Sequence, residues 1–188
     1  GSEMCIRDRP GVNIYRTPLN GRNFEYMGED PCLAGEMVVP YIRGLQSNGV
    51  AACVKHFALN NQEKWRGNIN VKISDRALYE IYLPAFRRAV IDGDAWSIMG
   101  AYNRVWDQHC CHNSRLLNDI LRGEWGYKGT VITDWGGAHD TRQAALNGLD
   151  IEMGSFTNGL TSKAVLGFND YYLARPYLRM ICLLYTSD

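Results

Sequence analysis

Asp134 lies at the end of a β-favouring run, in the stretch YKGTVITDWGG of residues 127–137. Trp135 follows it directly, and two glycines then loosen the backbone and leave space for a ligand. The apolar face of a pyranose ring can stack on an indole while a carboxylate approaches the anomeric carbon. The pattern therefore indicates a nucleophile or base acting on a sugar. The alternative is a helix N-cap, because a helix is expected to begin soon afterwards.

A second group of polar residues, Lys55 and His56, ends the apolar run of residues 49–54. Two adjacent donors there cost free energy unless they meet acceptors, which a hydroxyl-rich substrate supplies. The loop NNQEKWR, residues 60–66, adds amides, a glutamate and Arg66, which suit forked hydrogen bonds to hydroxyls. For Lys55 and His56 the alternative is a pair of surface residues at a strand end.

The stretch QHCCHN, residues 108–113, contains four side chains of metal-ligating type. Adjacent ligands cannot all face one ion, and zinc sites normally space their ligands by two or more residues. Neither cysteine carries a sign of thiol activation. We therefore predict no metal site and no cofactor.

Strand and helix patterns alternate at least three times along the chain. Residues 74–93 form one apolar face at helical spacing, with Ser74 or Asp75 as the N-cap and Pro84 as a kink or early boundary. Further helices are predicted over residues 34–49, 113–126 and 138–148, and strands over residues 49–54, 96–102, 129–133 and 149–153. Continuous apolar strands favour a parallel sheet, in a doubly wound fold or a closed barrel. No glycine-rich phosphate motif follows any of the predicted strands, which argues against a nucleotide-binding member of either fold.

Polar residues follow three of the predicted strands. In a barrel the carboxyl ends of the strands share one rim, where active sites form. The residues expected to meet at that rim are Lys55 and His56, Tyr102 and Asn103, and Asp134 and Trp135.

The composition is that of an ordinary globular protein: 188 residues, 46% hydrophobic, 21% charged, with a formal net charge of zero. Neutrality argues against a nucleic-acid partner, and no apolar run approaches the ~20 residues of a membrane span. The six cysteines are too few and too irregularly spaced for a disulfide framework.

Residues 1–9 and 182–188 match nothing adjacent to them, and we interpret them as adapter-derived, non-native segments rather than genuine disordered termini. The domain is then residues 10–181, truncated at both ends, and its localisation stays open.

Several motifs occur together in one order: GRNFE..GEDP, KHF..NNQE..R, SDRALYEIYLPAF, M.AYN, ILRGEWGYKGTVITDW and GLDIEM. In this order the chain resembles glycoside hydrolase family 3, in particular its β-glucosidase branch, from about Pro10 to Ile181. The stretch KHFALNNQE argues against the N-acetylglucosaminidase branch, which carries a KHFPGHG-like loop. The resemblance implies an α/β fold, a partial (β/α)8 TIM-type barrel, followed in full-length members by a C-terminal α/β sandwich domain missing here.

The resemblance also implies a retaining, exo-acting β-glucosidase that works by double displacement, with Asp134 as the nucleophile. The implied sugar-binding positions are Arg22, Lys55, His56, Arg66, Met99, Tyr102 and Trp135. The basic side chains are expected to keep Asp134 ionised. The acid/base of this branch is a glutamate on the missing domain, so the chain alone is expected to be nearly inactive. Glu63 and Glu152 are the substitutes to consider, with a structural role equally open for Glu152.

The implied partners are a β-glucoside or oligosaccharide substrate and the missing sandwich domain, with no nucleic acid and no membrane. Two alternatives stay open, a β-xylosidase or related exo-glycosidase of the same family and a catalytically dead carbohydrate-binding barrel. An open part-barrel is also expected to leave its apolar inner face partly uncovered.

Overall fold

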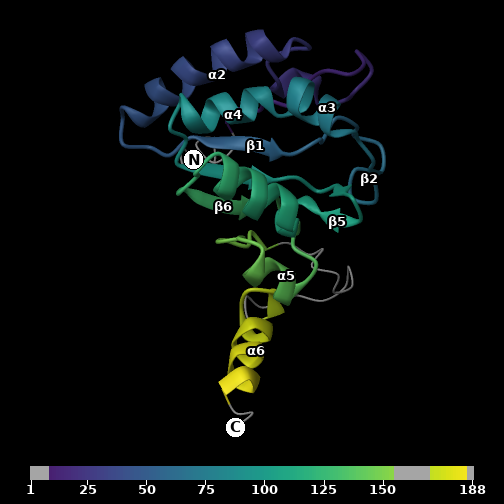
Figure 1. The fold of residues 1–188 in the computed structure, drawn as a ribbon, viewed down its shortest axis with the longest axis vertical. Helices are drawn as coiled ribbons and strands as arrows, with labels where there is room; N and C mark the ends of the chain where they lie inside the picture. The colour runs from purple at the N-terminus through teal and green to yellow at the C-terminus, as the bar shows by residue number, and fades with distance from the viewer. Residues whose placement is uncertain (1–8, 155–169, 186–188) are drawn as a thin grey trace.

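The computed structural model describes residues 9–154 and 170–185 of the chain (Figure 1). Its centre is a three-stranded parallel sheet in the order β1–β3–β6, formed by Cys53–Phe57, Ser97–Gly100 and Thr130–Thr133. Single parallel bridges extend both edges, at Gly11 beside Lys55 and at Ile151 beside Ile132. The α/β class with a parallel sheet is therefore confirmed, while closure into a barrel stays a prediction.

Two helices, α2 (Pro31–Gln46) and α4 (Pro84–Ile91), pack against each other, and α4 lies between α2 and β1 in Figure 1 and contacts β1. The side chain of Asp30 caps α2 by accepting hydrogen bonds from the first free N–H groups of the helix. The α2 helix runs through its internal proline, Pro40, because its buried side chains hold it against the layer beneath.

The single helix predicted over residues 74–93 is divided. A short α3 (Asp75–Ala77) and a π-helix, η2 (Leu78–Tyr82), precede α4, which begins at Pro84. Proline lacks an N–H group and fits the first turn of a helix, so the predicted boundary at Pro84 is confirmed. The Ser74 hydroxyl accepts a hydrogen bond from the Ala77 N–H group, as expected of the N-cap.

A second, smaller sheet was not predicted. Its strands are β2 (Asn70–Val71), β4 (Arg104–Val105) and β5 (Gln108–His109), in the order β2–β4–β5. Strands of two residues carry no periodicity that a sequence pattern can detect. This sheet ties the long loop after β1 to the loop after β3, so both loops are held near the carboxyl ends of the main strands.

The other elements are η1 (Asn23–Glu25), η3 (Cys110–His112), η4 (Arg115–Glu124), α5 (Thr141–Leu146) and α6 (Arg175–Tyr185). The predicted helix over residues 113–126 is the π-helix η4, capped by the side chain of Asn113 and followed by Gly126 with a φ of 66°. The strand predicted over residues 149–153 is wrong in extent, since only one bridge forms there. No helix among the described residues is long and apolar enough to cross a bilayer.

The apolar side chains separate by sheet face. Val54, Ile98 and Val131 point toward the helices and belong to the main core. On the other face Cys53, Met99 and Ile132 form a small cluster, each less than a tenth exposed. These three side chains lie on adjacent strands and shield one another, so the expectation of a partly uncovered inner face is wrong for them.

Candidate active site

Lys55 and His56 lie within β1 rather than after it, and both are buried. The sequence interpretation ended the strand where its apolar run ends, but polar side chains can occupy a buried strand when they meet partners. The pairing of β1 with β3 is irregular between Val54 and Phe57, at the position of this polar pair.

His56 is held from three sides. The side-chain amide of Asn13 bonds both the N–H and the C=O group of His56, at 2.9 and 3.1 Å. The Tyr26 hydroxyl lies 2.9 Å from Nδ1, and Nε2 lies 3.3 Å from an Arg22 nitrogen. Burial, followed by the charges of Arg22 and Lys55, lowers the pKa of His56 well below its ordinary value, so the fold favours the neutral imidazole.

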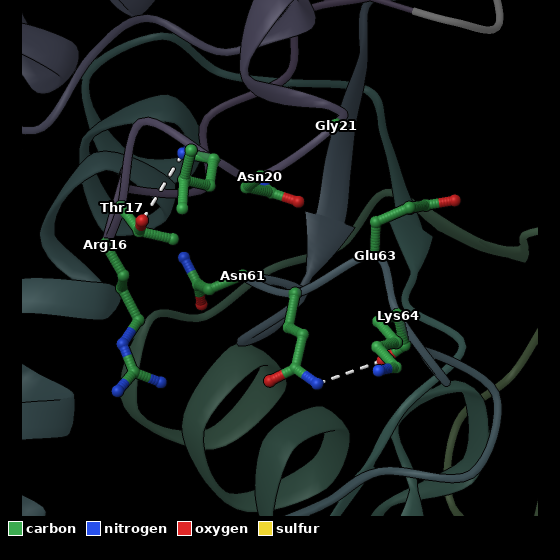
Figure 2. A pocket seen from close by; sticks show the side chains of 9 residues that line it. Arg16, Thr17, Asn20, Gly21, Asn61, Glu63 and Lys64 are labelled. Carbon is green, nitrogen blue, oxygen red and sulfur yellow. Dashed lines mark hydrogen bonds between the residues drawn. The ribbon is translucent and has the colours of Figure 1, made fainter.

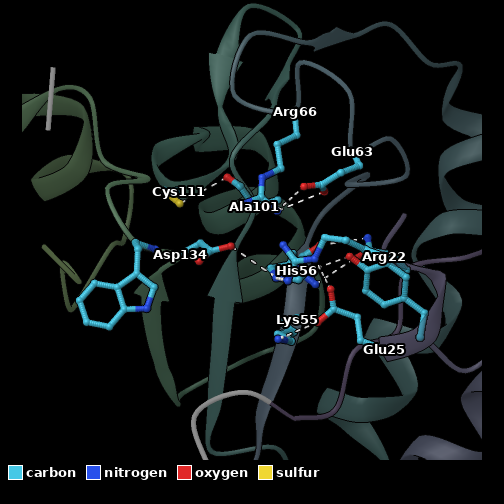
Figure 3. A network of polar contacts seen from close by, with 12 residues as sticks. Arg22, Glu25, Lys55, His56, Glu63, Arg66, Ala101, Cys111 and Asp134 are labelled. Carbon is cyan, nitrogen blue, oxygen red and sulfur yellow. Dashed lines mark hydrogen bonds and ion pairs between the residues drawn. The ribbon is translucent and has the colours of Figure 1, made fainter. Parts of the chain in front are cut away.

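Glu25 connects the two cations of the site (Figure 3). Its carboxylate lies 3.0 Å from the Lys55 ammonium and forms a close ion pair with Arg22. Burial acts to raise the pKa of Glu25, but the hydrogen bonds from Arg22 and Lys55 outweigh it and lower that pKa. From the sequence, Glu25 was expected only to take part in the charge pairs of its loop, and its ion pair with Arg22 agrees with that; its contact with Lys55 was not predicted.

Asp134 follows β6 and faces His56, with 3.4 Å between Oδ2 and the imidazole Nε2 (Figure 3). Its other oxygen, Oδ1, accepts a hydrogen bond from the N–H group of Trp135 at 2.8 Å. The N-cap of the following helix, α5, is Asp140, whose Oδ1 accepts from Gln143 N–H at 2.7 Å. The capping alternative for Asp134 is therefore wrong, since another residue performs that task.

The pKa of Asp134 is raised above its ordinary value because the side chain is buried. Four neighbours lower this pKa without cancelling the effect of burial. In order of decreasing effect they are a hydrogen bond from the Trp135 N–H group, the charge of Arg22, a hydrogen bond from Tyr102 and the charge of Arg66. Arg22 and Arg66 thus act in the expected direction, because they favour the ionised carboxylate, but burial outweighs them in the net shift of the pKa. Only the packed structure reveals how much water the carboxylate loses.

The remaining predicted sugar-binding residues differ in their placement. The Arg66 guanidinium lies 4.7 Å above the Tyr102 ring and 3.0 Å from a Glu63 oxygen, so it links the long loop to the Asp134 environment. Met99 is buried in the small inner-face cluster. Trp135 is 54% exposed, which leaves much of its indole open to a ligand.

Other polar residues singled out in the sequence have structural partners. Glu152 accepts a hydrogen bond from Leu173 N–H at 2.8 Å, which supports a structural role. The side chain of Asn103 donates to the Ala58 carbonyl at 3.1 Å. Burial raises the pKa of Cys111 well above its ordinary value, as expected of an inert thiol. In the described part of the chain, no group of three or more His, Cys, Asp or Glu side chains is arranged to hold a metal ion.

The structure thus gathers a buried carboxylate, a neutral imidazole and cationic donors at the strand ends of a parallel α/β domain, the place where enzymes of this fold class carry their active sites. The chain belongs to glycosyl hydrolase family 3, whose N terminal domain model matches residues 7–155. This assignment confirms the family that the sequence motifs indicated.

Relatives and solved structures of the same family are similar to the chain. The β-glucosidase BoGH3A of Bacteroides ovatus is 71% identical over 96% of this chain and 25% of its own length. An exo-alpha-(1->6)-L-arabinopyranosidase of Bifidobacterium breve is 50% identical over 81% of this chain and 21% of its own length. The structure of β-glucosidase 3B from Thermotoga neapolitana in complex with glycerol aligns with a TM-score of 0.85 and 38% identity, over 95% of this chain and 24% of that one. The chain thus spans about a quarter of the length of these proteins.

Proposed function

We propose that the protein to which this chain contributes is a retaining, exo-acting β-glucosidase. The observation that carries the proposal is the meeting of Asp134 with His56, Tyr102 and the Arg22–Glu25–Lys55 group at the strand ends. The names of BoGH3A and of the Thermotoga enzyme support glucoside as the substrate class. We also propose that the main sheet is part of a (β/α)8 barrel, since its two edge bridges continue the parallel order.

Asp134 is the nucleophile in this proposal. Its carboxylate attacks the anomeric carbon, the bond to the leaving oxygen breaks, and a glycosyl-enzyme ester forms. A carboxylic acid, about 5–5.5 Å from the nucleophile in retaining enzymes, protonates the leaving oxygen and then takes a proton from the attacking water. That water releases the sugar and restores the Asp134 carboxylate.

The side chains around Asp134 hold the sugar. Lys55 and Arg22 are cationic donors for ring hydroxyls, and Glu25 fixes both of them. The neutral His56 lies against Asp134, with 3.4 Å between Nε2 and Oδ2, and adds no further buried charge beside the nucleophile. Trp135, half exposed beside the nucleophile, provides a stacking surface for the apolar face of the sugar.

The acid/base group lies outside this chain in our proposal. Among the described glutamates, Glu63 is paired with Arg66 and Glu152 is bonded to the backbone of Leu173. Neither is therefore assigned the acid/base role. We expect the 188-residue chain alone to be nearly inactive toward glucosides, and turnover by the isolated chain equal to that of a complete relative would contradict this.

The test uses a chimera in which this chain replaces the matching segment of BoGH3A, which is 71% identical to it. Asp134→Asn should reduce hydrolysis of an activated aryl β-glucoside by a factor of about 10³ or more, as loss of a nucleophile does. The matched control is Asp107→Asn, whose side chain is 74% exposed and pairs with Lys72. A 2-fluoro glucoside should label the peptide that contains Asp134. Full activity of Asp134→Asn, or a label on another residue, would remove Asp134 from the mechanism.

A catalytically dead carbohydrate-binding barrel gives a different result in the same test. Such a barrel would bind glucose but would hydrolyse no aryl glucoside, and Asp134→Asn would change no activity. Absence of turnover by a folded chimera would therefore favour the binding protein.

A second candidate is an exo-glycosidase for pentopyranosides. The arabinopyranosidase relative, 50% identical over 81% of the chain, is the observation that favours it. Aryl β-glucoside, aryl β-xyloside and aryl α-L-arabinopyranoside distinguish the candidates in the same chimera. Higher kcat/KM for either pentoside than for the glucoside would support the second candidate over the first.

A further inference from the structure

Three loops leave the strand ends around Asp134, and they are held in different ways. The loop after β1 faces the loop before η1 across a hollow of about 440 Å³, which side chains of both loops line (Figure 2). The segments after β3 and β6 contact each other directly. The ring of His109 in β5 stacks on the ring of His139, with 3.8 Å between the centroids and 24° between the planes. An imidazole pair therefore joins these two segments.

Each ring of the pair is connected to a residue of the proposed sugar site. His109 Nδ1 lies 3.2 Å from the backbone carbonyl of Tyr102. A carbonyl only accepts, so Nδ1 carries the hydrogen and donates it. The Tyr102 side chain in turn bonds Asp134. His139 lies shortly after Asp134, in the segment between β6 and α5. The placement of Tyr102 relative to Asp134 therefore depends on the stacked pair.

A third histidine completes the cluster. The centroid of the His112 ring lies 5.7 Å from that of His109 and 6.5 Å from that of His139, and His112 is 2% exposed. Its Nδ1 lies 3.2 Å from Oε1 of Gln143 in α5, while its Nε2 is buried and has no hydrogen-bond partner among the described residues. A proton on Nε2 would create a buried N–H group without an acceptor, which costs free energy. The packed cluster therefore favours the neutral ring.

The surroundings of the three rings also oppose a positive charge. Burial is the largest cause for each ring, and it lowers the pKa of His109 to about 4 and also lowers the pKa of His112 and of His139. Arg104 of β4 acts in the same direction on the stacked pair. Asp140, the N-cap of α5, acts the other way on His112. A ring released into water takes up a proton near its ordinary pKa of 6.5, so acid below that pH favours a state in which the rings are apart and exposed.

We infer that His109 and His139 are positioning residues, which clamp the segment after β6 to the segment after β3, and that acid opens this clamp. The inference rests on the proposed glycosidase function and adds to it a control of the same site by pH. With neutral rings, the stack holds Tyr102 beside Asp134. With protonated rings, two cations at this distance repel each other and Arg104, so the segment that carries Asp134 moves away.

The first test compares variants at position 139 in the chimera with BoGH3A, with an aryl β-glucoside as substrate. His139 makes no side-chain hydrogen bond to another described residue. His139→Phe therefore keeps a ring that can stack and loses the capacity to take up a proton. His139→Ala loses the ring and should lower kcat/KM at neutral pH by about threefold to tenfold, the effect of one stacked pair. His139→Phe should recover most of that loss.

The pH profile separates positioning from plain structural support. In wild type, the acidic limb of kcat/KM should reflect more protons than the one that Asp134 binds, because opening of the clamp adds its own. The limb of His139→Phe should be less steep, by up to about one proton. Glu80→Gln, at an exposed pair with Arg76, is the matched control and should keep the limb of wild type. Limbs of equal slope in wild type and His139→Phe would overturn the clamp.

The second measurement uses the 188-residue chain itself and needs no turnover. Hydrogen exchange of the amides of residues 134–140, corrected for the pH dependence of the intrinsic rate, reports opening of the segment. Between about pH 7 and pH 5 the protection in wild type should fall by about tenfold or more, and His139→Phe should reduce this fall by about threefold or more. The amides of α4, which contains no histidine, serve as the internal control.

The outcomes keep the two proposals apart. Protection that changes equally with pH in wild type and His139→Phe overturns the clamp and leaves the glycosidase function intact. Absence of aryl-glucoside hydrolysis by the folded, unmutated chimera overturns the function, and exchange on the chain alone then decides the clamp. Equal kcat/KM of His139→Ala and wild type at neutral pH removes His139 from the positioning role.

Discussion

Replacing Glu25 by glutamine should destabilise the chain although no core volume is lost. The Glu25 carboxylate is 6% exposed as a side chain and faces the Lys55 ammonium, which is 5% exposed. Removing one member of a buried ion pair costs about 3–5 kcal/mol, because the other charge stays buried without that counter-charge. We expect the lower end, about 3 kcal/mol, because glutamine keeps one acceptor oxygen and the Arg22 side chain, 20% exposed, can recover water.

The assay is urea unfolding of the 188-residue chain at neutral pH, followed by circular dichroism. With a urea dependence of about 2 kcal/mol per molar, the midpoint should fall by about 1.5 M. The matched control is Glu80→Gln, at an exposed pair with Arg76 whose side chains are 59% and 84% exposed. A pair of that kind contributes at most about 1 kcal/mol, so its midpoint should fall by less than about 0.5 M.

Acidification should reduce the difference between wild type and Glu25→Gln. The pKa of Glu25 is lowered in the fold, so its stabilising contribution is present above the ordinary value of 4.5 and is lost as pH falls through the lowered pKa. The variant has no carboxylate to protonate at this position. Equal midpoints for Glu25→Gln and Glu80→Gln at neutral pH would refute the assigned role of Glu25.

Three further predictions concern pH and the site. Because burial raises the pKa of Asp134, Asp134→Asn should raise the free energy of unfolding, and the gain should grow as pH rises through the raised pKa. Urea titrations at several pH values measure this gain. A constant or negative difference between variant and wild type would contradict it. Tyr102→Phe removes a hydrogen bond to the charged carboxylate of Asp134, which should raise the pKa of that carboxylate further. The acidic limb of the pH–kcat/KM profile of the chimera should therefore move to higher pH. An unchanged limb would contradict the contact between Tyr102 and Asp134. Burial and the neighbouring His139 lower the pKa of His109 to about 4, so its contribution to stability should decrease as pH falls from about 6.5 toward 4. His109→Phe should flatten that part of the stability profile relative to wild type, and an identical slope would count against it.

The sequence determined the order of elements and the position of Asp134. The apolar run of residues 130–133 and the helix caps at Ser74 and Asn113 depend on local propensity and spacing, which a linear chain carries explicitly. The motif order likewise indicated the family before any geometry was known. These features were predictable because each depends on residues close together in the chain.

The tertiary structure decided which charges meet and which of them lose water. The contact between His56 and Asp134 joins a residue of β1 to the residue that follows β6, and the amide of Asn13 fixes the backbone of His56 from 43 positions away. The net shift of the Asp134 pKa depends on the balance between burial and several charges, and only the packed environment sets that balance. The small sheet β2–β4–β5 was hidden for the same reason, since strands of two residues are stabilised by pairing and not by their own sequence. The local sequence thus identified Asp134 and His56 as candidate reactive groups, whereas long-range packing determined the distance between them and the direction of their pKa shifts.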